Sequence, residues 1–331
     1  MGVSIVIPCL NEEKYINDCI MSLVNNGFSK SEMEILIVDG GSTDGTLPIV
    51  ELLQKEHQFI KVVPNPHKKT PFALNIGIKN SANSYVLIAG AHAVYPKHYI
   101  EKLYNLIQKQ GIDVVGGGIE TKVKNRTHKT AAIKFVLSHR LGVGNSKFRV
   151  GANKMLEVDT VPFGMYKKEV FEKAGVYNEK LIRNHDIELS KRIKHSGFSI
   201  WMEPSLKVAY YARETYAGLA KNNYSNGFWN IKTLFITKRF KSLSFRHYVP
   251  MLFVLSLVVP LIFGFLVSKR FYFASLILIS FYLFVVLLLS FTNSKKVHPL
   301  YLFFAFITLH FSYGAGSIMG LLPVFKFKKD R

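Results

Sequence analysis

The sequence predicts an α/β domain with a doubly wound sheet, followed by a membrane domain. Short β-branched runs alternate with amphipathic segments through the first part of the chain, which is typical of strand–helix units in a largely parallel sheet. Three long apolar segments follow near the end of the chain, and each has about the length that crosses a bilayer as a helix. A mean hydropathy of +0.16 over 331 residues agrees with a chain that has both parts.

Strands and helices are predicted to alternate along residues 3–118. Residues 3–7 form a strand that Pro8 ends, and Asn11 is the predicted cap of the following helix, which carries apolar positions at 16, 20, 23 and 24. Ligands bind such sheets at the carboxyl ends of strands, so the candidate site segments are 8–12, 39–44 and 90–92. The further expected strands are 34–38, 61–63, 85–89 and one beginning at 114, with helices through 49–53 and over 72–79 and 97–108.

Asp39 follows the second predicted strand and precedes two glycines. The glycines let the backbone approach a ligand closely, and the carboxylate can accept hydrogen bonds from a base or a ribose. An Asp-Gly turn without a ligand explains the same residues. The dinucleotide spacing Gly-x-Gly-x-x-Gly is absent, and residues 8–13 hold two acids and no glycine-rich basic loop, so we set aside a nucleotidyltransferase.

The second half of the domain, residues 119–230, holds two features of interest. Residues 121–154 are basic and rich in Gly, Asn and Lys, with an apolar helical piece at 131–137. This composition fits a mobile loop over a site and equally fits a surface insertion. Asp186 stands at the start of a predicted helix that Gly197 ends, where a carboxylate serves either as a helix cap or as a catalytic group.

The predicted membrane domain, residues 248–322, contains spans at about 248–267, 271–291 and 298–322. Glycines in the third segment leave open whether it crosses fully. The formal net charge is +21, yet no Asp or Glu occurs from Thr215 to Lys329, and the juxtamembrane segment 231–247 is basic. This distribution indicates a cytoplasmic face near anionic lipid and no nucleic-acid partner. A transporter would need more spans and charges inside the membrane.

Residues 1–230 are expected to lie in the cytoplasm. The strand at 3–7 is not preceded by a signal-peptide pattern, and two cysteines, Cys9 and Cys19, are too few for a disulfide framework. The predicted organisation is therefore a cytoplasmic domain over 1–230, divided near residue 118, then the juxtamembrane segment, the membrane domain and a basic tail over 323–331.

Four motifs in order resemble family 2 glycosyltransferases with the GT-A fold. They are IVIPCLNEEKYI, ILIVDGGSTDGT, VDTVPFGMYKKEVFEKAGVYNEKLIRNHDIELSKRI and, before the spans, YYARETYAGLAKNNYSNGFWN. The resemblance covers the whole chain and is greatest to the membrane-bound branch that builds succinoglycan-type exopolysaccharides. It implies a nucleotide-sugar transferase domain with a mixed sheet, followed by transmembrane helices.

The resemblance also implies roles for individual residues. Pro8 and Glu12 would line the nucleotide pocket, Asp39 would hold the base or ribose, and Asn75 would lie on the helix that flanks the pocket. Asp186 would be the general base that takes the proton of the acceptor hydroxyl, because a sugar hydroxyl is a poor nucleophile until a carboxylate accepts that proton. Inversion at the anomeric carbon would follow from one in-line displacement.

Gly90 departs from the family pattern. In the family this strand end carries Asp-x-Asp or Asp-x-His, which binds Mn²⁺ or Mg²⁺ at the leaving diphosphate. Here Gly90 replaces the first Asp, His92 is the one remaining candidate ligand, and lysines such as Lys68, Lys69 or Lys154 could replace the cation. The alternatives are an active enzyme with a weakened metal site and a non-catalytic nucleotide-sugar-binding protein.

The acceptor is expected at the membrane. Six aromatic residues precede the spans at 210, 211, 216, 224, 228 and 229, and aromatic side chains favour the membrane interface. We expect transfer of one sugar to a polyprenyl-diphosphate-linked oligosaccharide, or to a polyprenyl phosphate, at a bacterial cell membrane. A processive polymerase is disfavoured because residues 222–229 lack the Gln-x-x-Arg-Trp signature.

Overall fold

The computed structural model describes residues 2–239 and 242–322, and packing divides the chain into two compact units. The sheet unit comprises Met1–Lys122 and Lys147–Tyr211, and the helical unit comprises Val123–Ser146 and Ala212–Arg331. The predicted tail 323–331 lies outside the described residues. By packing, residues after Tyr211 group with the apolar helices, and the functional boundary at residue 230 stays a prediction.

Nine strands of the described residues form one mixed sheet. Strands β1 to β4 are parallel to one another, whereas β8 pairs antiparallel with both β4 and β6. The mixed sheet confirms the predicted fold class. The order is β3 (Ile60–Pro64), β2 (Met33–Asp39), β1 (Val3–Cys9), β4 (Tyr85–Ile88), β8 (Met165–Lys167), β6 (Val114–Lys122), β9 (Ile200–Tyr211) and β5 (Ala93–Val94), with β7 (Leu156–Glu157) on β9.

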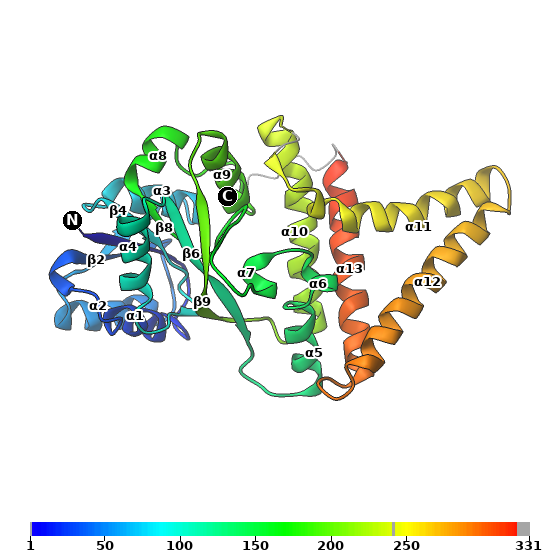
Figure 1. Cartoon of the computed structure of the whole chain (residues 1–331), viewed down its shortest axis with the longest axis horizontal. Coiled ribbons are helices and arrows are strands. Elements are labelled where there is room, and N and C mark those ends of the chain that lie inside the picture. Colours follow the sequence, from blue (N-terminus) through cyan, green and yellow to red (C-terminus); the bar gives the residue numbers. More distant parts are fainter. Residues whose placement is uncertain (1, 240–241, 323–331) are drawn as a thin grey trace. The chain divides into compact units, whose positions relative to one another are not determined.

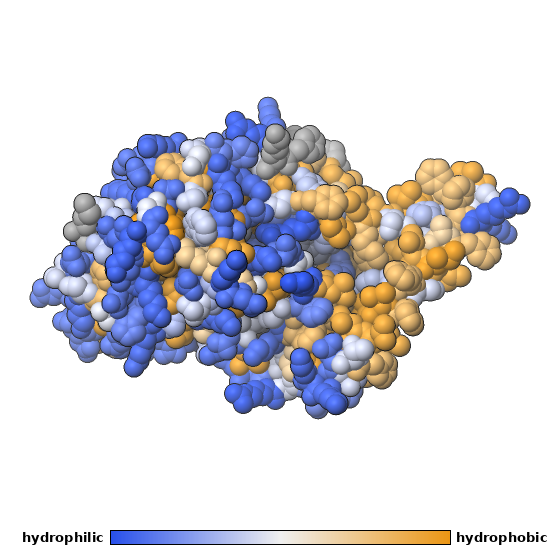
Figure 2. All heavy atoms as spheres, in the orientation of Figure 1, coloured by the Kyte–Doolittle hydropathy of each residue, from blue (hydrophilic) through white to orange (hydrophobic). Residues whose placement is uncertain are grey.

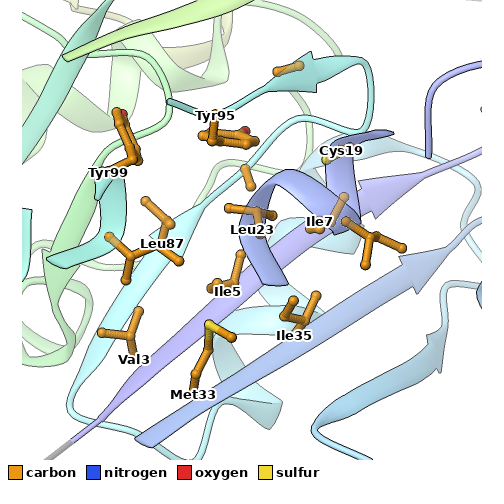
Figure 3. Close-up of a cluster of buried hydrophobic side chains, with 14 of the residues drawn as sticks. Val3, Ile5, Ile7, Cys19, Leu23, Met33, Ile35, Leu87, Tyr95 and Tyr99 are labelled. Atoms are coloured by element: carbon orange, nitrogen blue, oxygen red, sulfur yellow. The ribbon is translucent and has the colours of Figure 1, made fainter. Parts of the chain in front are cut away.

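Helices cover both faces of this sheet because its strands alternate side chains between two cores. In β1, Ile5 and Ile7 belong to one core, which Figure 3 shows with Leu23 and Tyr99 from the covering helices. Val6 points to the other core. The first core packs on α1 (Ile16–Val24), α2 (Thr46–Glu56) and α4 (Tyr99–Gln110), and the second on α3 (Thr70–Asn80), α8 (Lys168–Ala174) and α9 (His185–His195) (Figure 1).

The register of the central strands aligns their carboxyl ends. Cys9 of β1 lies opposite Asp39 of β2, and Val6 lies opposite Ile88 at the end of β4. The loops that follow these strands therefore start from the same edge of the sheet. This arrangement brings together the three segments that the sequence marks as candidate site segments.

The predicted cap of the first helix is wrong. Asn11 lies in the left-handed region with φ +55°, and α1 begins only at Ile16. The carbonyl oxygen of Glu12 accepts hydrogen bonds from the backbone of Tyr15 and Ile16, so residues 12–15 form a turn before the helix. The Asn11 side chain instead accepts a hydrogen bond from the Thr43 amide at 2.8 Å, which joins the loops after β1 and β2.

The helical unit contains the three predicted apolar segments as helices α11 (Val249–Leu266), α12 (Phe271–Thr292) and α13 (Pro299–Leu321). All three are long and apolar enough to cross a membrane. Helices α11 and α12 form a hairpin, and Figure 2 shows apolar residues over its surface. The remaining helices of this unit are α5 (His128–Val136), α6 (Arg140–Val143), α10 (Tyr216–Thr237) and the 3-10 turn Phe245–His247.

Helix α13 differs from the hairpin helices in how closely it packs on protein. Of its most apolar stretch 39% is buried, compared with 17% for α11 and for α12. Its partner is α10, and glycines let the two backbones approach: a Cβ at Gly316 would stand 2.0 Å from the carbonyl oxygen of Tyr224, and one at Gly227 would stand 2.1 Å from that of Tyr313. Close approach through small residues is a recurring mode of helix packing in membranes.

Candidate active site

A cavity of about 560 Å³ opens within the sheet unit at the carboxyl ends of β1 and β4. Residues singled out from the sequence line it, among them Pro8, Glu12, Gly90, His92 and Asp186. They come from the end of β1, from the loops after β1 and β4, and from the first turn of α9. The position agrees with the rule that open α/β sheets bind ligands beyond the carboxyl ends of their strands.

Glu12 and His92 form a pair among the residues that line the cavity. Oε1 of Glu12 lies 3.3 Å from Nδ1 of His92, and the His92 ring contacts Tyr15 and Tyr210 at centroid distances of 6.4 and 5.2 Å. The backbone amide of Glu12 donates to Oγ1 of Thr46 at 2.8 Å. This bond fixes the backbone from which the Glu12 side chain extends. A carboxylate that pairs with one ring nitrogen of an imidazole fixes the orientation of the ring, so that the other nitrogen, here Nε2, is the one that can contact a ligand. The residue pattern did not predict this pair.

Gly90 has no room for a side chain. A Cβ at this position would lie 2.8 Å from Cε1 of Phe163, closer than real Cβ contacts. The backbone of Phe163 is fixed by a hydrogen bond from the Tyr99 hydroxyl to its carbonyl oxygen at 2.8 Å, and its φ is +50°. The Gly90 amide donates to the Tyr95 hydroxyl at 2.8 Å. The aromatic ring therefore fills the space that an aspartate at position 90 would need.

Asp186 lies exposed in the first turn of α9, after Asn184 in the left-handed region. Beside it, burial lowers the pKa of His185, and the charge of Asp186 acts in the opposite direction. His185 is therefore mainly neutral at pH 7. The Asp186 carboxylate thus lines the cavity beside a neutral His185.

Asp39 and Asn75 do not line this cavity. Asp39 is buried, and its carboxylate accepts hydrogen bonds from the amides of Gly41 and Ser42 at 2.7 and 3.0 Å and from the Ser42 hydroxyl at 2.5 Å. It shapes the turn after β2 in the way that the turn interpretation expects. Its predicted contact with a base or ribose stays a prediction.

Asn75 joins α3 to the segment before α9. Its Nδ2 donates to the carbonyl oxygen of Tyr177 at 2.9 Å and to Oε1 of Glu179 at 3.0 Å, and its Oδ1 accepts from the Tyr177 amide at 2.9 Å. The side chain therefore supports the loop that leads to Asp186. Its role at a nucleotide stays a prediction.

Cations that the cavity presents come from three places. Lys68 and Lys69 line it from the loop before α3, as proposed for replacement of a metal, whereas Lys154 is not among the lining residues. Arg149 of α7 (Lys147–Val150) and Arg183 also line it. The sequence analysis missed both arginines; Arg149 lies in the basic stretch 121–154, and such a stretch is usually a solvated surface.

The donor set does not fit the metal site of the family. Among residues 2–239 and 242–322 there is no group of three or more His, Cys, Asp or Glu that could hold a metal ion. His92 presents one imidazole, its Nδ1 is paired with Glu12, and a Cβ at position 90 would lie 2.8 Å from the Phe163 ring. Mg²⁺ and Mn²⁺ prefer several oxygen ligands. His92 as a metal ligand stays a prediction.

Comparisons with known proteins agree with the fold. The family model "Glycosyl transferase family 2" matches residues 4–175. A Methanococcus voltae dolichyl N-acetyl-alpha-D-glucosaminyl phosphate 3-beta-D-2,3-diacetamido-2,3-dideoxy-beta-D-glucuronosyltransferase is 33% identical over 68% of this chain and 71% of its own length. The succinoglycan biosynthesis protein ExoA of Rhizobium meliloti is 31% identical over 63% of each chain.

Two solved structures share the fold. The mannosyltransferase PcManGT from Pyrobaculum calidifontis, in complex with GDP-Man and Mn²⁺, superposes with a TM-score of 0.61 at 13% identity and covers 96% of this chain and 86% of its own. S. aureus TarS 1-349 in complex with UDP-GlcNAc gives a TM-score of 0.52 at 16% identity, covering 96% and 91%. These likenesses support a GT-A-like mixed sheet. The family match, over more than half of the chain, shows that this protein is a glycosyltransferase that belongs to glycosyl transferase family 2.

Proposed function

We propose that this protein is an inverting glycosyltransferase that moves a sugar from a nucleotide-sugar to a membrane-lipid-linked acceptor in cell-surface or exopolysaccharide synthesis. The observation that carries the proposal is that Asp186 lines the same cavity as Glu12, His92 and the residues at the carboxyl ends of β1 and β4. A cavity of about 560 Å³ is within the range of small-molecule sites. Such a cavity with one exposed carboxylate at its edge can hold a donor and present it to an acceptor hydroxyl.

The reaction requires a single displacement. The acceptor oxygen forms a bond to the anomeric carbon while the bond from that carbon to the diphosphate oxygen breaks, and the bonding electrons leave with the nucleoside diphosphate. Asp186 accepts the hydroxyl proton as the acceptor attacks. Attack opposite to the leaving group inverts the anomeric configuration, and holding both substrates in line supplies much of the rate enhancement.

The donor and acceptor classes rest on the relatives. The solved relatives bind UDP-GlcNAc and GDP-Man, and the Methanococcus relative's name specifies a dolichyl-phosphate-linked acceptor. By extension, the donor here is a nucleotide-sugar and the acceptor a polyprenyl-linked saccharide or polyprenyl phosphate. The three apolar helices would place the protein in a bacterial membrane as a multi-pass protein, with residues 1–230 as the cytoplasmic catalytic region.

The test is sugar transfer in membranes from a host that lacks the activity. Labelled UDP-, GDP- and dTDP-sugars are offered, lipids are extracted, and products are separated by size. Wild type is compared with Asp186→Asn and with Glu172→Gln, whose exposed carboxylate on α8 is not among the cavity-lining residues. We expect transfer of one sugar by wild type and Glu172→Gln, with a loss of at least a hundredfold in Asp186→Asn.

A second candidate function is a non-catalytic nucleotide-sugar-binding protein. The specific observation in its favour is the filled space at Gly90, where the family places a metal-binding aspartate. This alternative predicts that the folded protein binds a nucleotide but transfers no sugar from any donor. The same assay therefore separates the two functions, and a long product ladder would instead indicate a polymerase.

A further inference from the structure

The Phe163 ring packs where a side chain at position 90 would lie, so the cavity is shaped around a glycine in place of the family's metal-binding aspartate. The ring lies 2.8 Å from the place where a Cβ of residue 90 would be, and Phe163 also packs edge-on against Tyr95 at a centroid distance of 5.8 Å. With no aspartate and with His92 paired to Glu12, the remaining donors hold a divalent cation poorly. Another group must then offset the charge of a departing diphosphate.

Arg149 is a cation placed for that role. It lines the same cavity as Asp186 from the four-residue helix α7, and its side chain is half-buried. Among the described residues no carboxylate forms an ion pair with it, and its guanidinium carbon lies 5.6 Å from the centroid of the Phe148 ring. Burial lowers the pKa of Arg149 and the nearby Asp186 acts in the opposite direction, so the guanidinium remains charged at neutral pH.

A half-buried guanidinium without a carboxylate partner is costly unless something anionic binds there. Arginine suits a phosphate because its planar fork can donate two parallel N–H bonds to two oxygens. At a half-buried position such bonds are stronger than on an open surface. Arg149 thus has the chemistry and the location of a diphosphate ligand.

We propose that Arg149 binds the donor's diphosphate and takes over the charge-neutralising role of the family's divalent cation. The proposal rests on the proposed function for its substrate class. As the bond between the anomeric carbon and the diphosphate oxygen breaks, the electron pair stays on that oxygen, and the guanidinium N–H groups stabilise the added negative charge. No proton, electron or further co-reactant is needed for this role.

The test is nucleotide binding to the full-length protein in detergent, measured by calorimetry. UDP, GDP and dTDP are titrated in EDTA and again with Mn²⁺, and the matching nucleosides serve as probes without phosphate. The variants are Arg149→Gln, Arg149→Lys and Lys147→Gln. Lys147 lies on the same short helix, is not among the lining residues, and provides the matched loss of one positive charge.

We expect EDTA to change the wild-type affinity for the preferred diphosphate less than twofold. Arg149→Gln should weaken that affinity at least tenfold, about 1.4 kcal/mol, while leaving nucleoside binding unchanged. The affinity of Arg149→Lys should lie between those of wild type and Arg149→Gln, because lysine keeps the positive charge and lacks the planar guanidinium fork. Lys147→Gln should bind as wild type does.

A strong loss of wild-type affinity in EDTA that Mn²⁺ restores would overturn the proposal, as would equal binding by Arg149→Gln and Lys147→Gln. The transfer assay keeps this failure distinct from failure of the proposed function. Transfer that requires Mn²⁺ refutes the role of Arg149 and leaves the enzyme intact. Binding that depends on Arg149 without transfer refutes the enzyme and leaves the diphosphate site. Absence of nucleotide binding refutes both.

Discussion

At the scale of single residues, Gly90 and Phe163 depend on each other. The glycine leaves space for the ring, and the ring closes the space that a side chain would use. A Gly90→Ala substitution should therefore destabilise the protein by about 1–3 kcal/mol through overpacking. Thermal unfolding in detergent measures this, with Gly118→Ala as the matched control, because a Cβ there would meet its nearest atom at an ordinary 3.5 Å.

The coupling between the two residues provides the stricter test. Phe163→Leu removes the ring atoms nearest to position 90, so the double variant Gly90→Ala/Phe163→Leu should be less destabilised than the sum of the single variants. Additive effects would show that the ring does not limit this position. The comparison uses changes in unfolding temperature measured under one set of conditions.

The environment of Glu34 makes the stability of the fold depend on pH. Burial raises the pKa of Glu34, but hydrogen bonds from Ser4 and Ala82 and the ion pair with Lys61 outweigh this and hold the pKa below its ordinary value. A carboxylate with a lowered folded-state pKa stabilises the fold above the unfolded-state pKa of about 4.3, and this contribution is lost as the pH falls through the lower, folded-state value.

Glu34→Gln should therefore be less stable than wild type at neutral pH and should lose less of its stability on acidification. Glu51→Gln, an exposed position on α2, is the control and should follow the wild-type profile. Unfolding temperatures measured from pH 7 to pH 3 give the comparison. Parallel profiles for wild type and Glu34→Gln would contradict this assignment.

At the scale of elements, the strand–helix order and the strand ends were predictable, and local turn geometry was not. The β-branched runs predicted strands, and their ends predicted the cavity position through Pro8, Glu12, Gly90 and His92. Asn11 failed as a helix cap because its side chain bonds across to Thr43, a tertiary contact that local sequence does not reveal. Arg149 was missed for the same reason, because only folding distinguishes it from its basic neighbours.

Helices α10 and α13 provide an element-scale prediction. Gly316→Leu should disrupt the helical unit, since any Cβ there would meet the Tyr224 carbonyl oxygen at 2.0 Å. Ala315→Leu introduces the same side chain one residue earlier, where the side chain is exposed. We expect a lower unfolding temperature and poor recovery in detergent for Gly316→Leu alone. Equal behaviour of the two variants would contradict the close α10–α13 packing.

At the scale of the whole molecule, we expect charge to set the orientation in the membrane. The turn between α11 and α12 contains Lys269, and the segment between α12 and α13 contains Lys296, so a crossing hairpin puts these lysines on opposite sides. The basic segment 231–247 favours the cytoplasm for the start of α11. Lys269 should then face outward and Lys296 inward.

Cysteine labelling tests this orientation in intact cells. Burial and nearby carboxylates raise the pKa of Cys9 to about 12, and Cys19 is buried, so the native thiols should react slowly. An impermeant maleimide should label Lys269→Cys in intact cells and Lys296→Cys only after permeabilisation. The reverse pattern would place the catalytic region outside the cytoplasm.

The most direct single measurement is the initial rate of sugar transfer to extracted lipid in EDTA, for wild type and Asp186→Asn with one identified donor. We predict that wild type adds one sugar with inversion at a rate that EDTA does not abolish, and that Asp186→Asn loses at least a hundredfold. Folded wild-type protein that binds the nucleotide and transfers nothing, or an Asp186→Asn variant as fast as wild type, would contradict a glycosyltransferase that uses Asp186 as its base.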